Sequence, residues 1–164
     1  MKLELKNVKF YESMSEETNC FQADLFINGK KIACVKNSGQ GGCTDYHVLD
    51  FSQQQILRDA EAYCKGLPKV KYSENEYAVT LETVIDDLFE AWLKVKADKK
   101  LLKDMEKGLM YGNKYGYTII TWNVPLKAML MSIKGREIIR KKIVQLRVEE
   151  ETILNTNIPK ELFN

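Results

Sequence analysis

The sequence has little arginine, and this shortage bears on the class of partner. Only four of its 25 basic residues are arginine, at positions 58, 136, 140 and 147. Arginine makes most bidentate contacts to phosphates and bases, so the composition argues against sequence-specific binding of nucleic acid. The net charge of +2 names no partner. A nucleic-acid-associated role through the many lysines stays open as an alternative.

Long apolar runs are also missing. No stretch approaches the roughly 20 apolar residues that a membrane-spanning helix needs. The N-terminus alternates charged and apolar residues over positions 1–6 and has no apolar core of a signal peptide. We therefore expect no association with a membrane and a cytoplasmic location.

The four cysteines form no C-x-x-C pair. In a cytosolic protein of this size we expect them to be reduced thiols. Four zinc ligands do not converge easily at such spacing, so the sequence predicts no metal site. Nothing in it indicates a cofactor. These cysteines are Cys20, Cys34, Cys43 and Cys64.

The length of 164 residues and the 45% apolar content are typical of one globular domain. The expected elements are four strands, two helices, two strands and a last helical region. This order predicts an α+β fold, with an antiparallel sheet built from β-hairpins and three to four helices packed on it. We expect a single domain over 1–164, hairpin-rich over about 1–51 and mixed helical over about 52–164.

The clearest local signal is Asn28-Gly29, a favoured type I′ turn between two strand-like runs. With these two residues in the loop, Ile27 pairs with Lys30 and Ala23 pairs with Cys34. One face of this hairpin is then more apolar and should meet the core. That face carries Phe21, Ala23, Leu25, Ile27, Ile32 and Cys34.

Other elements follow from periodicity. A slip near Asn7 predicts a bulge in a strand over 2–11. Residues 45–51 are expected to form another strand. Ser52 has Gln three residues later, the form of a capping box, and predicts a helix to about Lys65. A connector is expected over 68–75, followed by a helix over 78–107 with a kink or break at 98–100. A hairpin is expected over 109–122, with its turn near 112–114. The last region, 123–147, is expected to be helical and to end or bend at Gly135.

A glycine-rich stretch over 37–47 is the best candidate for a functional site, because three glycines fall within four residues. Glycine is tolerated where φ is positive or where the backbone approaches another group closely. Successive N–H groups in such a turn can form an anion-binding concavity, which Lys36 would assist. The phosphate-loop patterns are missing, so a plain strand connection is the alternative. The predicted binding residues are Lys36, Asn37, Ser38, Gly39, Gln40, Gly41, Gly42, Cys43 and Tyr46.

Histidine-based catalysis would have to use His47, the only imidazole in the chain. It could act with Asp45, two residues away, or with Cys43 if a turn brings them together. A small hydrolase or transferase is therefore an alternative function, and a half-buried structural histidine is the simpler interpretation. The neighbours Asp86 and Asp87 are expected to be solvated, because adjacent helical residues do not face each other.

Several short segments are shared with a known group of proteins. They are Ser15-Glu16-Glu17-Thr18, Cys20-Phe21, Ala23, Leu25, Gly29-Lys30-Lys31, Asn37, Gly39, Gly41-Gly42-Cys43, Tyr46 and Ile153-Leu154-Asn155. In these residues the chain resembles a loose family of small uncharacterised proteins of bacteriophages, prophages and their bacterial hosts. The resemblance covers about the first 50 residues, and the helical C-terminal region is longer here.

The resemblance implies a small accessory viral protein that acts on host machinery, as in counter-defence. Our leading hypothesis is a non-enzymatic protein that binds a host protein or a small anionic ligand through the glycine-rich loop, in the bacterial cytoplasm. A homo-oligomer also stays open, since the apolar stripe over 81–95 is long for one domain.

Overall fold

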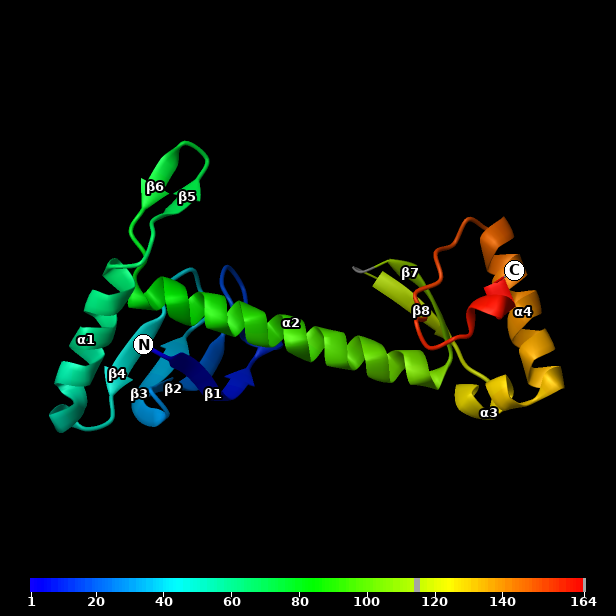
Figure 1. The fold of residues 1–164 in the computed structure, drawn as a ribbon, viewed down its shortest axis with the longest axis horizontal. Helices are drawn as coiled ribbons and strands as arrows, with labels where there is room; N and C mark the ends of the chain where they lie inside the picture. Colours follow the sequence, from blue (N-terminus) through cyan, green and yellow to red (C-terminus); the bar gives the residue numbers. More distant parts are fainter. Residues whose placement is uncertain (114–115, 164) are drawn as a thin grey trace. The chain divides into compact units, whose positions relative to one another are not determined.

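The structure, a computed structural model, describes residues 1–113 and 116–163. These residues form three antiparallel sheets and four α-helices, so the predicted α+β class is confirmed (Figure 1). The chain divides into two compact units, Met1–Leu93 and Lys94–Asn164. The sequence had suggested one domain with a change of character near residue 51. The boundary between the two units lies within the long helix.

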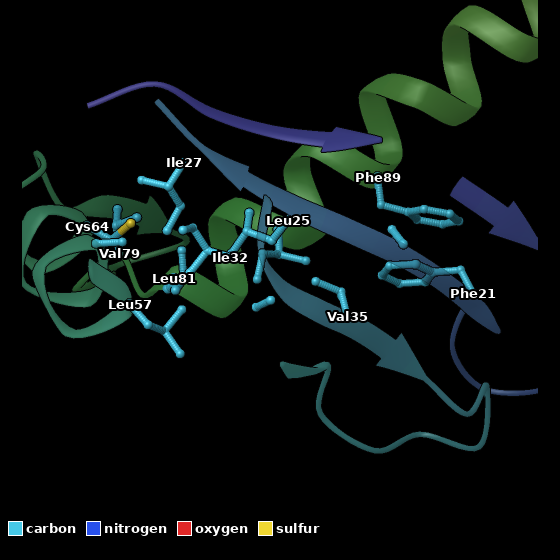
Figure 2. Packing of buried hydrophobic residues seen from close by; sticks show 14 residues of the cluster. Phe21, Leu25, Ile27, Ile32, Val35, Leu57, Cys64, Val79, Leu81 and Phe89 are labelled. Atoms are coloured by element: carbon cyan, nitrogen blue, oxygen red, sulfur yellow. The ribbon is translucent and has the colours of Figure 1, made fainter. Parts of the chain in front are cut away.

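The N-terminal unit, Met1–Leu93, is built on a four-stranded antiparallel sheet whose strands lie in chain order. The strands are β1 (Leu3–Phe10), β2 (Phe21–Ile27), β3 (Lys30–Asn37) and β4 (Asp45–Val48). The apolar side chains of one face pack against α1 (Gln54–Lys65) and the first turns of α2 (Leu81–Lys107), as Figure 2 shows. The opposite face of the sheet carries mostly polar side chains, and we call it the outer face.

The predicted hairpin turn is confirmed. Asn28 and Gly29 have φ values of 50° and 84°, as a type I′ turn requires at both central positions. Phe21, Leu25 and Ile32 lie together in the core, with exposed fractions of 2% or less. The Asn-Gly pair therefore sets the start of the register and places the apolar face of β2 inward.

A bulge in β3 overturns part of the predicted register. The ladder shifts by one residue at Ile32, so Ala23 pairs with Val35 and not with Cys34. The prediction that Cys34 lies on the buried face is therefore wrong, because its side chain is exposed. The bulge lets Ile32 and Ala33 both enter the core, which buries more apolar surface than regular alternation would.

The bulge predicted in β1 is confirmed, since Asn7 has a φ of 53° and the register shifts between Lys6 and Lys9. The strand expected over 45–51 is shorter and ends at Val48. The capping box at Ser52 was wrong: the side chain of Asp50 accepts the N–H of Ser52 at 2.9 Å. Asp50 thus begins a 3₁₀ turn, Phe51–Gln53, that continues into α1.

Replacing Asp50 by alanine should loosen the start of α1. Its hydrogen bonds to Ser52 hold the pKa of Asp50 below its usual range. The stabilisation is therefore present above the ordinary carboxyl pKa and is lost as pH falls through the lowered value. We expect faster amide exchange over 52–56 in Asp50→Ala, with a difference from wild type that shrinks in acid. Ser52→Ala keeps the backbone N–H that Asp50 accepts, so its effect should be smaller. An equal effect would mean that the Ser52 hydroxyl, as in a capping box, holds the start of the helix.

Two further elements differ from expectation. The connector over 68–75 contains a small hairpin, β5 (Val70–Tyr72) and β6 (Asn75–Tyr77). Strands this short carry too few residues for alternation to be recognised. The break considered at 98–100 does not occur, because α2 runs through this segment as one helix. That segment contains neither proline nor glycine, so nothing in it opposes a helix.

The C-terminal unit, Lys94–Asn164, joins a hairpin to two helices. Its elements are β7 (Leu109–Asn113), β8 (Gly116–Ile120), α3 (Leu126–Met131) and α4 (Ile133–Val148). Gly112 and Asn113 of the predicted turn belong to the ladder, and Lys114 lies outside the described residues. Gly135 neither ends nor bends a helix. It lies in the first turn of α4, where Ser132 caps its N–H at 3.0 Å.

No helix in the described parts of the chain is both long and apolar enough to cross a membrane.

Candidate functional site

The glycine-rich loop between β3 and β4 is fixed to the segment that precedes β2. Gly39 and Gly41 have φ values of 85° and 80°, which confirms that the loop needs positive φ. The Gly39 carbonyl accepts three N–H groups, from Glu16, Glu17 and Thr18, at 2.9–3.3 Å. These three hydrogen bonds hold the backbone of the loop against residues 16–18.

Asn37 organises the same loop from its buried position at the end of β3. Its Oδ1 accepts the N–H of Gly39 and the hydroxyl of Thr18, both at 2.9 Å. Its Nδ2 donates to the Gly42 carbonyl at 3.2 Å and to the Thr44 hydroxyl at 3.0 Å. All four hydrogen-bonding positions of this amide are therefore used, and the loop closes around it.

Thr44 ties the loop to α2. Its N–H donates to Oε1 of Glu82 at 3.0 Å, and its hydroxyl donates to Oδ1 of Asp86 at 2.6 Å. Cys43 lies in the same environment: a hydrogen bond with the Glu82 carboxylate, helped by nearby carboxylates, raises the pKa of its thiol. Carboxylates on one face of α2 therefore set the charge next to the loop.

A cavity of about 310 Å³ opens between this loop and α2, and we call it the acidic cavity. Phe21 and Phe89 form the apolar part of its wall, stacked with their ring centres 3.9 Å apart. None of its described lining residues is basic. The other lining residues are Glu17, Thr18, Asn19, Asn37, Gly42, Thr44, Glu82, Asp86 and Glu90.

The carboxylates of the acidic cavity repel one another. Burial, together with the negative charges of Glu82, Asp87 and Glu90, raises the pKa of Asp86, while its hydrogen bond from Thr44 opposes the rise. A positive charge placed among these groups would be stabilised. Across the described residues, no three acidic, cysteine or histidine side chains are arranged to hold a metal ion. With carboxylates beside an apolar wall, the cavity is complementary to a cationic group that has an apolar stem.

From the sequence we expected the loop to bind an anion, and the structure does not favour this. The N–H groups of Gly39 and Gly41 are already taken by Asn37 and Thr18, so neither is free for an anion. Lys36 points to the outer face of the sheet, where it lines a different cavity. The geometry therefore favours a cation where the sequence suggested an anion.

Apart from Lys36, the predicted binding residues separate into three groups. Asn37 and Gly42 line the acidic cavity, while Gly39 is buried behind it. Ser38, Gln40 and Gly41 are exposed on the loop, beside Cys43. Tyr46 faces α1, where its hydroxyl donates to Glu61 at 3.1 Å; burial and this bond raise the pKa of Tyr46 to about 12.

The carboxylates of α2 were missed by sequence reasoning. Asp86 had been assigned to a solvated pair with Asp87, yet its side chain faces the acidic cavity. The signal was the spacing of Glu82, Asp86 and Glu90, which are four residues apart and so share one face of the helix.

His47 does not meet Cys43. Asp45 and His47 share the outer face of β4, as predicted, but Asp45 stands opposite Lys36 in the ladder. Cys43 lies beside Glu82 of α2, on the side of the sheet that carries the helices. The residue directly opposite His47 is Cys34 of β3.

No protein family model, curated protein or solved structure matches this chain.

Proposed function

We propose that the protein is a non-enzymatic accessory protein of phage or mobile-element origin, which binds a host protein in the bacterial cytoplasm. The observation that carries the binding role is the acidic cavity, with four carboxylates in its wall. The origin and the location rest on the resemblance of the first 50 residues to phage and prophage proteins.

The partner's chemistry follows from the wall of the cavity. A lysine or arginine side chain of a host protein would lay its apolar stem along Phe21 and Phe89. Its charged end would then meet Glu82, Asp86 and Glu90 of α2. Complementary charge of this kind steers association and fixes orientation. The phosphates of a nucleic acid would be repelled at the same place.

A charge-matched pair of peptides tests this function. A short glycine-flanked peptide with one central arginine should shift the amide NMR signals of Gly42 and Thr44. The same peptide with citrulline, a neutral analogue of nearly equal shape, should leave them unchanged. Glu90→Gln should weaken arginine-peptide binding by about tenfold, since a hydrogen bond to a charged group is lost.

Matched variants locate the effect. Glu90 is exposed and accepts a hydrogen bond from Asn19 at 2.9 Å, which glutamine can keep, so the fold should be unaffected. Gln40→Ala, on the exposed loop outside the cavity, should bind as wild type does. A host protein retained by wild type should be released by Glu90→Gln but not by Gln40→Ala. Equal binding of the arginine and citrulline peptides would refute the proposal.

A further inference from the structure

A row of reactive side chains crosses the outer face of the sheet. Asp24 of β2 stands opposite Cys34 of β3, and Cys34 stands opposite His47 of β4. Residues directly opposite in an antiparallel ladder place their side chains on the same face, with Cβ atoms roughly 4.5–5.5 Å apart. The thiol and the only imidazole of the chain are therefore neighbours, and both are exposed.

These two side chains lie in a second cavity, of about 420 Å³, on the outer face. Lys9 and Lys36 also line it, and the row's carboxylate, Asp24, is already engaged. Asp24 accepts a hydrogen bond from Asn7 at 2.7 Å and pairs with Lys31 at 2.9 Å. Asp45, another acidic group on this face, stands opposite Lys36 in the ladder.

The surroundings of Cys34 include basic side chains as well as the imidazole. Lys31 interacts electrostatically with Cys34 as well as with Asp24. Cationic groups and an imidazole next to an exposed thiol are the surroundings in which cysteines become reactive. The lysines that line the cavity would also attract a reagent that carries carboxylates.

The other three thiols lack these features. Cys20 and Cys64 are buried, and burial raises the pKa of Cys64. Cys43 is exposed, but the neighbouring Glu82 carboxylate raises the pKa of its thiol and so disfavours the thiolate. Cys43 is therefore a natural internal control, because it matches Cys34 in exposure and differs from it in surrounding charge.

We propose that Cys34 is a thiol-exchange site, which forms a mixed disulfide with a small disulfide that bears carboxylates. His47 accepts the thiol proton, and the Cys34 sulfur attacks one sulfur of the reagent. The reagent's S–S bond breaks as the new one forms, and the other half leaves as a thiolate that takes the proton from His47. One disulfide is consumed and one is formed, so no further oxidant is needed.

This site is independent of the proposed binding function. The acidic cavity is lined by Phe21 and Phe89 on the face of the sheet that carries the helices, whereas Cys34 and His47 lie on the outer face. Modification of Cys34 would add a bulky anionic group to that outer face. The protein could then carry a reversible, redox-dependent mark without losing its binding cavity.

Oxidised glutathione, which is anionic, and cystamine, a cationic disulfide, are the two probes. The full-length protein is incubated with each, and intact mass with peptide mapping follows adducts on every cysteine. We expect glutathione adducts at Cys34 to form about tenfold faster than at Cys43. Cys34→Ser should abolish the fast reaction, and Cys43→Ser should leave it unchanged.

Two further variants separate the roles of the neighbours. His47→Gln should slow the reaction at Cys34 severalfold and leave the rate at Cys43 as it was. The double variant Lys9→Gln with Lys36→Gln should remove the preference for glutathione over cystamine. All three positions are exposed, and unchanged circular dichroism would show that the fold is intact. Modification of Cys43 as fast as Cys34, or a preference of Cys34 for cystamine, would overturn the proposal.

Discussion

Gly39→Ala is expected to destabilise the N-terminal unit by roughly 2–4 kcal/mol, from positive φ and steric overlap together. A Cβ atom at this position would lie 2.4 Å from the Met14 carbonyl oxygen and 2.8 Å from Cβ of Cys20. Neither neighbour is the end of a flexible side chain, so the backbone itself must move. That movement would also strain the three N–H groups that converge on the Gly39 carbonyl.

Gly42→Ala is the matched control in the same loop. Its φ is outside the left-handed region, and no atom lies within 4 Å of an added Cβ. We expect its free energy of unfolding to stay within about 0.5 kcal/mol of wild type. Trp92 packs on the core of the N-terminal unit, so urea unfolding followed by its fluorescence in a Trp122→Phe background reports on that unit. Equal effects of both substitutions would mean that the loop is not rigidly held.

The sequence-based predictions succeeded where a structure is specified by neighbouring residues. Asn28-Gly29 can adopt a type I′ turn without help from the rest of the chain, so both the turn and the first pairs of the hairpin were correct. The bulge at Ile32 was not foreseen, because either register alternates apolar and polar residues locally. The choice between the two registers is made by packing in the core, where both Ile32 and Ala33 are buried.

The candidate site could be predicted only in part, for a related reason. The glycines and Asn37 are close in sequence, and they do form one structure. Three of the four carboxylates of the acidic cavity come from α2, about 40 residues further along the chain, as in the hydrogen bond from Thr44 to Asp86. The sequence shows that these α2 carboxylates share one face of the helix. It does not show which strands and loops that face meets, because this depends on how the helix packs.

The pairing of Cys34 with His47 depended on the same bulge. With the regular register, Cys34 would lie on the buried face and could not meet an exposed imidazole. The extra residue at Ile32 turns Cys34 outward, opposite His47. A shift of one residue therefore decides whether the thiol is a core residue or a reactive one.

Asn155→Ala is expected to cost the C-terminal unit about 3 kcal/mol or more. Asn155 is buried, and its Oδ1 accepts the N–H of Met110 at 2.6 Å. Its Nδ2 donates to the carbonyls of Met105 and Gly108, at 3.2 and 3.0 Å, where α2 ends. Carbonyls at a helix C-terminus have no partner within the helix, so the Asn155 amide supplies the hydrogen-bond donors that α2 lacks at its end.

The size of the effect follows from what alanine leaves behind. The Met110 N–H and the Gly108 carbonyl would lose this partner in a place that water does not easily reach, whereas the Met105 carbonyl would keep its bond from Asn157. Each unsatisfied buried group costs about 1–3 kcal/mol. Asn157→Ala is the control, since Asn157 also donates to the Met105 carbonyl, at 3.1 Å, but is exposed. Water can replace its amide, so we expect a loss below about 1 kcal/mol.

The measurement needs a probe confined to this unit. Trp122 packs against its core, so urea unfolding followed by fluorescence in a Trp92→Phe background reports on residues 94–164. The midpoint should fall sharply for Asn155→Ala and slightly for Asn157→Ala, and amide exchange at Met110 should accelerate only in the first. If the two variants unfold at the same urea concentration, Asn155 does not stabilise the end of α2, and the hairpin and the helices alone must hold this unit together.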